Sequence, residues 1–281
     1  MSLSLKSSYR MHSGHVSYYE HLSTVTGTPM KFSLFLPEGG RKVKKTLLWL
    51  SGLTCTDENF MIKSGAQKKA QELDMAIICP DTSPRGLGLP GEEDSRDFGT
   101  GAGFYLDATE QPWSKNYRMH SYIMEELLPL LFANFPLDSQ RLALSGHSMG
   151  GMGALVLGIR YPEVFHSLSA LAPITNPSDC PWGVKAFTGY LGEDKSQWRI
   201  YDPTHLLEDI GYNGTILVHQ GKDDQALTTQ LKPDRIEAAA TKSGIDLKLT
   251  LCEGYGHSYY FVASFIDEHL HFHNVQLEAR P

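Results

Sequence analysis

The stretch Gly146-His147-Ser148-Met149-Gly150 decides the fold, because it joins a strand pattern to a helix pattern. Residues 141–145 form a short apolar run typical of a buried strand, and residues 151–159 form an apolar run typical of a helix. A G-x-S-x-G motif between such elements is typical of a sharp, strained turn that lifts a serine hydroxyl above a sheet. This setting predicts Ser148 as a nucleophile; the alternative is an ordinary glycine-rich turn.

Strand and helix patterns alternate on both sides of this motif. The runs that predict strands are residues 15–22, 30–36, 46–50, 75–79, 167–171, 215–219 and 246–251. Helical patterns lie at 64–73, 119–132, 230–242 and from 258 onward. This alternation predicts an α/β fold with a mostly parallel central sheet and helices on both faces.

Two segments interrupt the alternation. Residues 82–117 are rich in glycine, aspartate and aromatic residues without a clear period, and residues 174–202 form an excursion with several prolines and glycines. Long irregular segments inside a compact domain are usually functional. We therefore expect one domain over residues 1–281, in which both segments shape a site.

Composition excludes several classes of protein. The net charge of −7 over 281 residues argues against a nucleic-acid partner, which usually needs a basic patch. No apolar run reaches the length of a membrane span, and the first ten residues lack a secretory pattern, so we expect no membrane partner. The four cysteines are scattered without a C-x-x-C pair, which favours free thiols in a reducing cytoplasm.

A serine nucleophile needs a base within hydrogen-bond reach and a third group to hold that base. The strained turn in an alternating sheet is typical of the α/β-hydrolase fold, where serine, acid and histidine follow in this order after successive strands. His257 comes after the last predicted strand, between Gly256 and the final helical pattern. This order predicts His257 as the base; the alternative is a helix-capping or solvent-exposed histidine.

Two adjacent carboxylates compete for the role of the acid. Asp223 and Asp224 follow the strand at 215–219, and only one of them can point at the imidazole. Asp224 stands three residues after Gly221, a spacing common in this fold, so we favour Asp224. Asp223 then remains as a solvated or turn-stabilising carboxylate.

Two backbone N–H groups are expected to stabilise the oxyanion. One belongs to Met149, directly after the predicted nucleophile, and the other to the loop after the strand at 46–50. Leu53 is the favoured donor in that loop because Gly52 lets the backbone turn inward; an ordinary turn is the alternative.

The remaining histidines predict no metal site. On a helix only His269 and His273 share a face, without His271, and a solvated helix end explains all three. His147 is expected to face away from the substrate side and to have a packing role.

Several longer blocks of sequence are also distinctive. These blocks are residues 50–60, 101–109 with 112–113, 146–151, 181–187, 220–225 and 257–261. In their residues and in their order along almost the whole chain, these blocks closely resemble the S-formylglutathione hydrolases, also called esterase D. The resemblance implies an α/β-hydrolase in which Ser148, Asp224 and His257 form the catalytic triad, and it supports Asp224 over Asp223.

The resemblance also implies an activity. Members of this family are cytoplasmic thioesterases that hydrolyse S-formylglutathione to formate and glutathione, also act on short-chain esters, need no cofactor or metal, and are often homodimers. A formyl group requires a tight acyl pocket, for which Trp182, Phe104 and Tyr105 are candidates, with core packing as the alternative. Cys55 is expected near the nucleophile, as in similar proteins, rather than as a merely buried thiol.

Glutathione carries two carboxylates, so a cation is expected near the mouth of the site. Lys63, Arg85 and Lys185 are candidates, each with a solvated surface charge as the alternative. Two other functions remain: a general short-chain carboxylesterase of the same fold, and a non-enzymatic binding protein. The second is disfavoured because all three triad residues are present.

Overall fold

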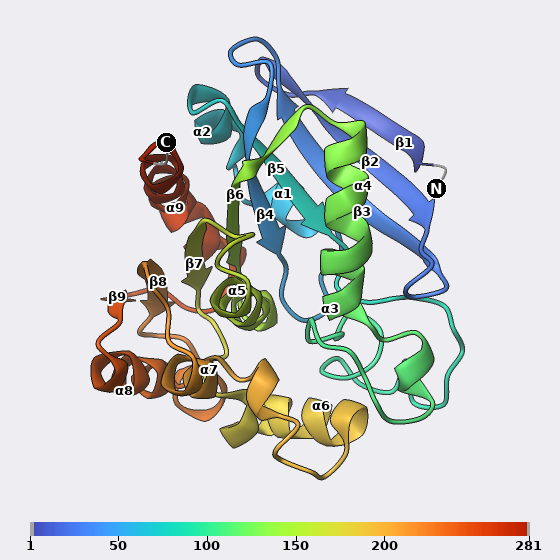
Figure 1. The fold of residues 1–281 in the computed structure, drawn as a ribbon, viewed down its shortest axis with the longest axis vertical. Helices are drawn as coiled ribbons and strands as arrows, with labels where there is room; N and C mark the ends of the chain where they lie inside the picture. The colour runs from blue at the N-terminus through green and yellow to red at the C-terminus, as the bar shows by residue number, and fades with distance from the viewer. Residues whose placement is uncertain (1–2, 280–281) are drawn as a thin grey trace.

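The computed structural model describes residues 3–279, and their strands form one twisted sheet (Figure 1). In spatial order the sheet reads β1-β2-β3-β5-β4-β6-β7-β8-β9. The strands are β1 (Leu3–Arg10), β2 (Gly14–Leu22), β3 (Pro29–Pro37), β4 (Lys44–Leu50), β5 (Met75–Pro80), β6 (Leu137–Gly146), β7 (Ser167–Leu171), β8 (Thr215–Gly221) and β9 (Asp246–Cys252).

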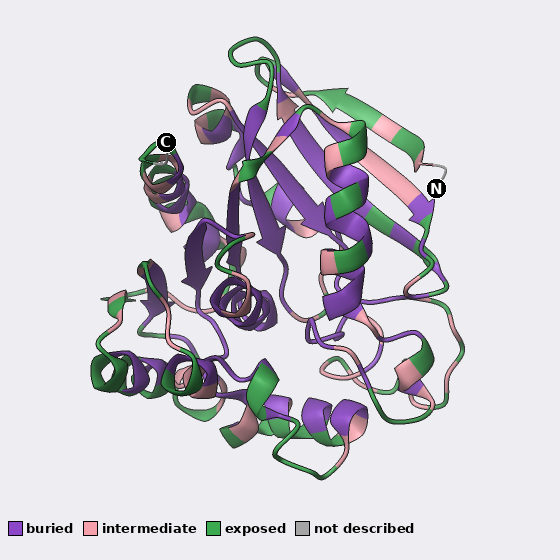
Figure 2. Ribbon diagram, viewed as in Figure 1, coloured by how far each residue is buried: buried purple, intermediate pink, exposed green. Residues whose placement is uncertain are grey.

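The sheet changes direction at β5. From β5 to β9 every neighbouring pair is parallel, whereas β1, β2 and β3 pair antiparallel and β3 joins β5 antiparallel. Every residue of β4, β5 and β7 is buried, as expected for parallel strands covered on both faces (Figure 2). The structure thus confirms the predicted mostly parallel sheet, and β1 is an additional strand that the sequence pattern did not predict.

Helices cover both faces of the sheet (Figure 1). On one face lie α4 (Leu128–Asn134), α5 (Met149–Arg160), α7 (Pro203–Asp209) and α8 (Pro233–Ser243). On the other face α2 (Gln67–Glu72) packs against α9 (Tyr259–Glu278), near the short α1 (Asn59–Lys63). In open α/β sheets of this kind, ligands bind in the crevice outside the carboxyl ends of the parallel strands.

Within the helix predicted over 64–73 the structure has only α2 (Gln67–Glu72), and the short α1 (Asn59–Lys63) lies before the predicted range. Gly65 lies between α1 and α2 with φ of +69°, a left-handed conformation that interrupts a right-handed helix. The helix predicted from 119 is continuous in space but changes type, as α3 (Met119–Ser121), a π-helical segment (Tyr122–Leu127) and α4.

The two irregular segments differ in the structure. Residues 82–117 contain one short 3₁₀ turn, Trp113–Lys115. The excursion at 174–202 is more regular than expected: it holds α6 (Pro181–Leu191) between 3₁₀ turns at Pro177–Asp179 and Arg199–Tyr201. A further π-helical turn, Leu227–Leu231, precedes α8.

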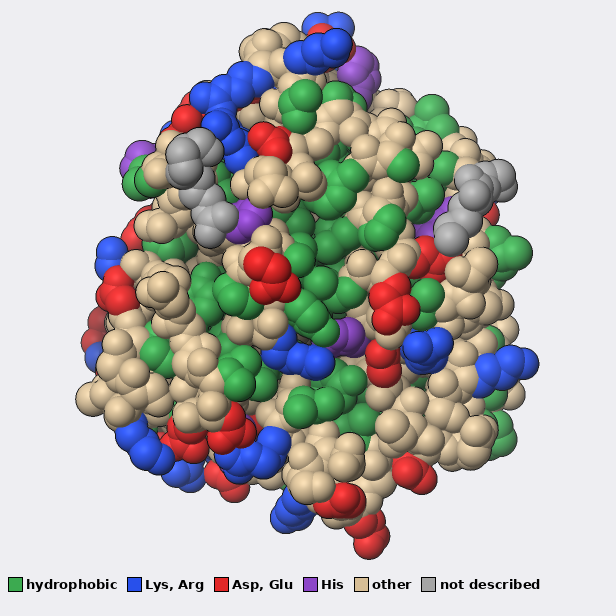
Figure 3. Space-filling view, viewed as in Figure 1, with side chains coloured by type: hydrophobic (Ala, Val, Ile, Leu, Met, Phe, Trp, Pro, Cys, Tyr) green, Lys and Arg blue, Asp and Glu red, His purple; other side chains and the backbone are tan. Residues whose placement is uncertain are grey.

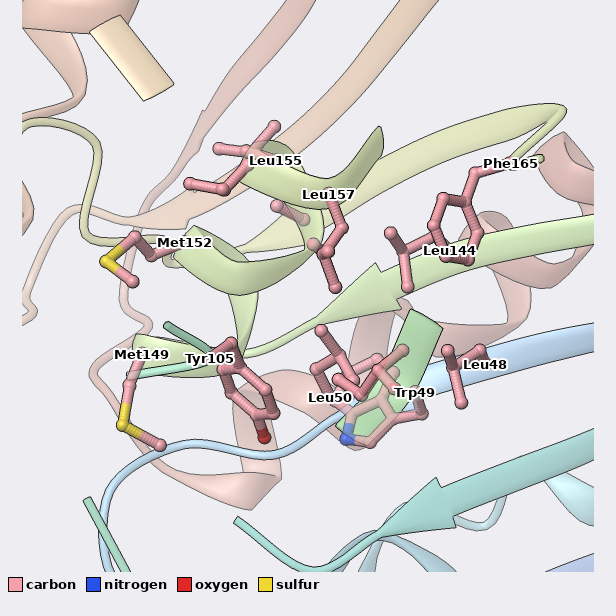
Figure 4. Close-up of a cluster of buried hydrophobic side chains, with 14 of the residues drawn as sticks. Leu48, Trp49, Leu50, Tyr105, Leu144, Met149, Met152, Leu155, Leu157 and Phe165 are labelled. Atoms are coloured by element: carbon pink, nitrogen blue, oxygen red, sulfur yellow. The ribbon is translucent and has the colours of Figure 1, made fainter. Parts of the chain in front are cut away.

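The core beside the sheet holds α5 tightly against β4 and β6 (Figure 4). All of α5 except its last residue is buried, and Trp49 of β4 stacks on Phe60 with ring centroids 3.9 Å apart. A Cβ at Gly153 would lie 2.5 Å from the ring of Tyr105, so this glycine lets the helix approach the aromatic ring. On the face shown in Figure 3, hydrophobic side chains gather in the middle, and acidic and basic side chains are interspersed around them.

Candidate active site

Ser148 lies on a strained turn between β6 and α5. Its φ and ψ are 60° and −120°, a conformation that L-residues rarely adopt. A Cβ at Gly146 would lie 2.3 Å from the carbonyl oxygen of Gly150, and one at Gly150 would lie 2.0 Å from that of Leu50. The two glycines of the motif are therefore required by the close approach of the turn to β4, as the predicted elbow demands.

A chain of hydrogen bonds joins Ser148 to His257 and Asp224. The Oγ of Ser148 lies 2.8 Å from Nε2 of His257, and Nδ1 of His257 lies 2.6 Å from Oδ2 of Asp224. Because a carboxylate only accepts, Nδ1 carries the ring hydrogen and Nε2 is left to accept from the hydroxyl. The arrangement places Nε2 of His257 where it can take the proton of Ser148.

The position of each partner follows from the strand that precedes it. Asp224 comes three residues after the end of β8, and its carboxylate is fully buried and also accepts from the N–H of Ala226 at 2.8 Å. Asp223 is exposed. His257 follows β9, directly before Ser258, whose side chain caps the first turn of α9. The structure thus brings Asp224, and not Asp223, to the histidine.

The loop after β4, which carries Leu53, lies against the turn that carries Ser148 and Met149. A Cβ at Gly52 would lie 3.1 Å from Cβ of Ser148, so the loop touches the turn. The N–H of Thr54 donates to Gly101 and that of Cys55 to Gly52. Within residues 3–279 no backbone carbonyl accepts from the N–H groups of Leu53 and Met149, which leaves both free for a ligand.

A cavity of about 480 Å³ opens over these groups. This volume lies in the range of pockets that enclose a small-molecule ligand. The lining residues are Gly52, Leu53, Thr54, Cys55, Arg96, Asp97, His147, Ser148, Trp182, His257, Ser258 and Tyr259. They come from the loop after β4, the irregular segment 82–117, the serine turn, the start of α6 and the start of α9.

Two of the predicted pocket residues line this cavity. Trp182 lies near the start of α6. Its backbone N–H donates to the side-chain oxygen of Gln230 at 2.9 Å, which joins α6 to the segment before α8. Cys55 is partly buried, and burial raises the pKa of its thiol above the usual value. Cys55 therefore lies near Ser148 as a neutral thiol rather than as a thiolate.

Phe104 and Tyr105 do not line the cavity, which corrects their predicted place in the acyl pocket. Both side chains are fully buried in the core, and both residues have positive φ. The hydroxyl of Tyr105 donates to the carbonyl of Ser51 at 2.7 Å. Tyr105 thus supports the loop after β4 from behind, and Figure 4 shows its ring beside Met149.

None of the three cations proposed for the mouth of the site lines the cavity, and each has a partner within the protein. Lys185 does not line the cavity; its ammonium lies 2.6 Å from Asp97, which does. Arg85 donates twice to Asp81, at 2.8 Å each. The ammonium of Lys63 lies 5.6 Å from the ring centroid of Tyr259.

His147 lies on the cavity side of the turn, contrary to the expectation that it faces away. Its ring centroid is 4.6 Å from that of His257, and burial lowers its pKa well below the usual value. The neutral ring packs beside the proposed base without adding a charge.

Of the three histidines of α9, His269 and His273 are buried, which corrects the expectation of a solvated helix end, and only His271 is exposed. His273 lies 2.7 Å from Oγ of Ser167 through Nδ1 and 2.8 Å from Oγ of Ser169 through Nε2. His269 lies 2.8 Å from the same Ser169 and 2.9 Å from His219 on β8. The two histidines share a face of the helix, and that face packs on the sheet.

Sequence patterns alone did not single out Arg96, Asp97, Ser258 or Tyr259. Ser258 and Tyr259 directly follow the predicted base, so their place in the lining follows from chain continuity. Arg96 and Asp97 lie in the irregular segment, where no period indicates which side chains face the cavity. Over residues 3–279 no group of three or more histidine, cysteine or acidic side chains is arranged to hold a metal ion. Nor does any helix in that range have the length and apolar character needed to cross a membrane.

Comparison with known proteins agrees with this geometry. Residues 23–272 match a family described as putative esterase. An S-formylglutathione hydrolase of Rattus norvegicus is 50% identical over 99% of this chain and 100% of its own length, and one of Arabidopsis thaliana is 50% identical over 96% of each chain.

Solved structures give the same result. An S-formylglutathione hydrolase from Agrobacterium tumefaciens superposes with a TM-score of 0.95 at 41% identity, covering 97% of this chain and 99% of that one. A Staphylococcus aureus fluorophosphonate-binding serine hydrolase shares the fold at 18% identity, with a TM-score of 0.73. The chain belongs to the S-formylglutathione hydrolase family of α/β-hydrolase esterases.

Proposed function

We propose that this protein is a serine thioesterase that hydrolyses S-formylglutathione to formate and glutathione, with side activity on short-chain esters. The observation that carries the proposal is the hydrogen-bonded chain from Ser148 through His257 to Asp224, open to a cavity of about 480 Å³. Relatives at 50% identity over nearly the whole chain bear the name of this activity.

The proposed reaction begins when His257 takes the proton of Ser148 as Oγ attacks the formyl carbon. The C–S bond then breaks, and the proton held by His257 passes to the leaving glutathione sulfur. Water, deprotonated by the same imidazole, attacks the formyl-serine and releases formate, which restores the Ser148 hydroxyl. Buried Asp224 keeps the Nδ1–H tautomer and stabilises the imidazolium formed in each half-reaction.

The negative charge that develops on the formyl oxygen needs donors already in place. The N–H groups of Leu53 and Met149 are the proposed donors, because no backbone carbonyl in residues 3–279 accepts from them. Tyr105 supports this arrangement indirectly, since its hydroxyl anchors the carbonyl of Ser51 two residues before Leu53. Trp182 and Cys55 are proposed to bound the small acyl pocket.

By the same resemblance we propose that residues 1–281 form a single domain, that the enzyme is cytoplasmic, and that two copies form a homodimer. Light scattering of the purified protein at twice the mass of one chain tests the dimer. A single cooperative unfolding transition tests the single domain.

A substrate profile tests the proposed function. The wild-type protein is expected to have a much higher kcat/KM for S-formylglutathione than for a short-chain aryl acetate. The reverse order would favour a general carboxylesterase. Ser148→Ala should lower turnover of both substrates by several powers of ten and abolish labelling by a fluorophosphonate. An unlabelled wild-type serine would instead favour a non-enzymatic binding protein.

A further inference from the structure

Arg96 is a cation in the cavity wall without a carboxylate partner. It lies in the irregular segment 82–117, is exposed, and lines the same cavity as Ser148. Across the described range 3–279, no acidic side chain lies within ion-pair distance of its guanidinium. Lys63, Arg85 and Lys185 differ in this respect, since each is held by an aromatic ring or a carboxylate.

The neighbouring carboxylate does not neutralise Arg96. Asp97 lines the cavity too, but its Oδ1 lies 2.6 Å from the ammonium of Lys185. Although partial burial opposes its ionisation, this hydrogen bond keeps the pKa of Asp97 below its usual value. Asp97 is therefore an anion committed to Lys185, and the guanidinium beside it keeps its donors for another partner.

The surroundings of Arg96 favour a carboxylate as this partner. The residues that line the cavity with Arg96 include Leu53, Cys55 and Trp182, none of which is charged. A guanidinium offers a planar fork of N–H donors that matches a carboxylate in a bidentate pair. The whole chain carries a net charge of −7, so it repels anions at long range and needs a local cation to hold one.

We infer that Arg96 binds a carboxylate of the leaving thiol, and so makes the enzyme selective for thioesters of anionic thiols. This inference rests on the proposed thioesterase function. Ser148, His257 and Asp224 then act on the acyl group, and Arg96 binds the charged end of the thiol. Arg96 is a specificity residue, because it touches the part of the substrate that leaves.

Kinetics on a matched pair of thioesters test the inference. S-formylglutathione and S-formyl-N-acetylcysteamine carry the same acyl group, but only the first has carboxylates in its thiol. Arg96→Ala is expected to lower the ratio of their kcat/KM values about tenfold, mainly through a higher KM for S-formylglutathione. Arg96→Lys should restore part of the ratio, as a point charge without the bidentate fork. Added salt should reduce the wild-type ratio toward that of Arg96→Ala.

Arg10→Ala is the matched control, because it removes the same charge from an exposed position on the edge strand β1. Its ratio should equal that of the wild type. An unchanged ratio in Arg96→Ala, or an equal loss on both thioesters, would overturn the inference while leaving the proposed function intact. A wild-type protein that hydrolyses aryl acetates but neither thioester would overturn the proposed function and the inference with it.

Discussion

The buried histidines of α9 predict a specific loss of stability in acid. Burial lowers the pKa of His273 to about 3, whereas an unperturbed histidine has a pKa of about 6.5. The folded protein therefore holds this ring neutral while the unfolded chain protonates it. Stability from this group is complete above about pH 6.5, and it is lost as the pH falls from there toward about 3. His269 contributes in the same direction. Burial is the larger cause of its lowered pKa, and the neighbouring His219 and His273 lower it further.

The magnitude for His273 follows from linkage. At about pH 5 the unfolded chain gains about 1.5 pH units of protonation free energy that the folded chain does not, at about 1.36 kcal/mol per unit. The resulting loss is about 2 kcal/mol of unfolding free energy relative to neutral pH. Solvent does not screen this effect, because the ring of His273 is fully buried.

Urea unfolding at about pH 7.5 and about pH 5 measures this loss. His273→Gln removes the titrating group, so its decrease between the two pH values should be smaller than that of the wild type by about 2 kcal/mol. The variant also loses hydrogen bonds, but the comparison uses each protein's own change with pH. His271→Gln, on the exposed side of the same helix, should keep the wild-type decrease. Equal decreases in the wild type and His273→Gln would refute the linkage argument.

Three further predictions concern the candidate site. Asp224→Asn should lower kcat by about 10⁴, because the amide favours the wrong imidazole tautomer. The kcat of Asp223→Asn should stay within about twofold of the wild type. Equal effects of the two substitutions would exclude Asp224 as the acid. Gly150→Ala places a Cβ 2.0 Å from a carbonyl oxygen and should cost about 3 kcal/mol of unfolding free energy or prevent folding. Gly244→Ala, at a positive φ in open space, should cost only about 1 kcal/mol, as denaturant unfolding will report. Cys55→Ala should retain turnover and lose inhibition by iodoacetamide, and because the thiol pKa is raised, wild-type inactivation should accelerate as the pH rises above neutral.

The sequence predicted the parts of the site that depend on strand order. Ser148, Asp224 and His257 each follow a strand of the parallel half, and such ends meet at one edge of the sheet. The local pattern was enough because each residue is placed by its own strand and turn. The choice of Asp224 over Asp223 needed only a spacing rule, and the burial of one carboxylate and exposure of the other agree with it.

The parts that depend on how an irregular segment packs were not predictable in the same way. Phe104 was predicted as a pocket residue because it is an aromatic residue of the block 101–109 that carries the family resemblance, but its side chain is buried in the core, which no sequence pattern indicates. Arg96 was not among the predicted site residues, since nothing in the local sequence indicates that it lines the cavity. His273 shares a helix face with His269, as predicted, but only the position of the sheet shows that this face is buried.

The order of the three site residues along the chain has a consequence for biosynthesis. Ser148 emerges from the ribosome well before His257, which depends on β9 to hold it in place. A nascent or truncated chain that ends before β9 contains the nucleophile but no base. Such a chain has no activated serine with which to attack thioesters in the cell. Hydrolytic activity therefore appears only once the last strand has docked, so it reports that synthesis and folding of the C-terminal part are finished.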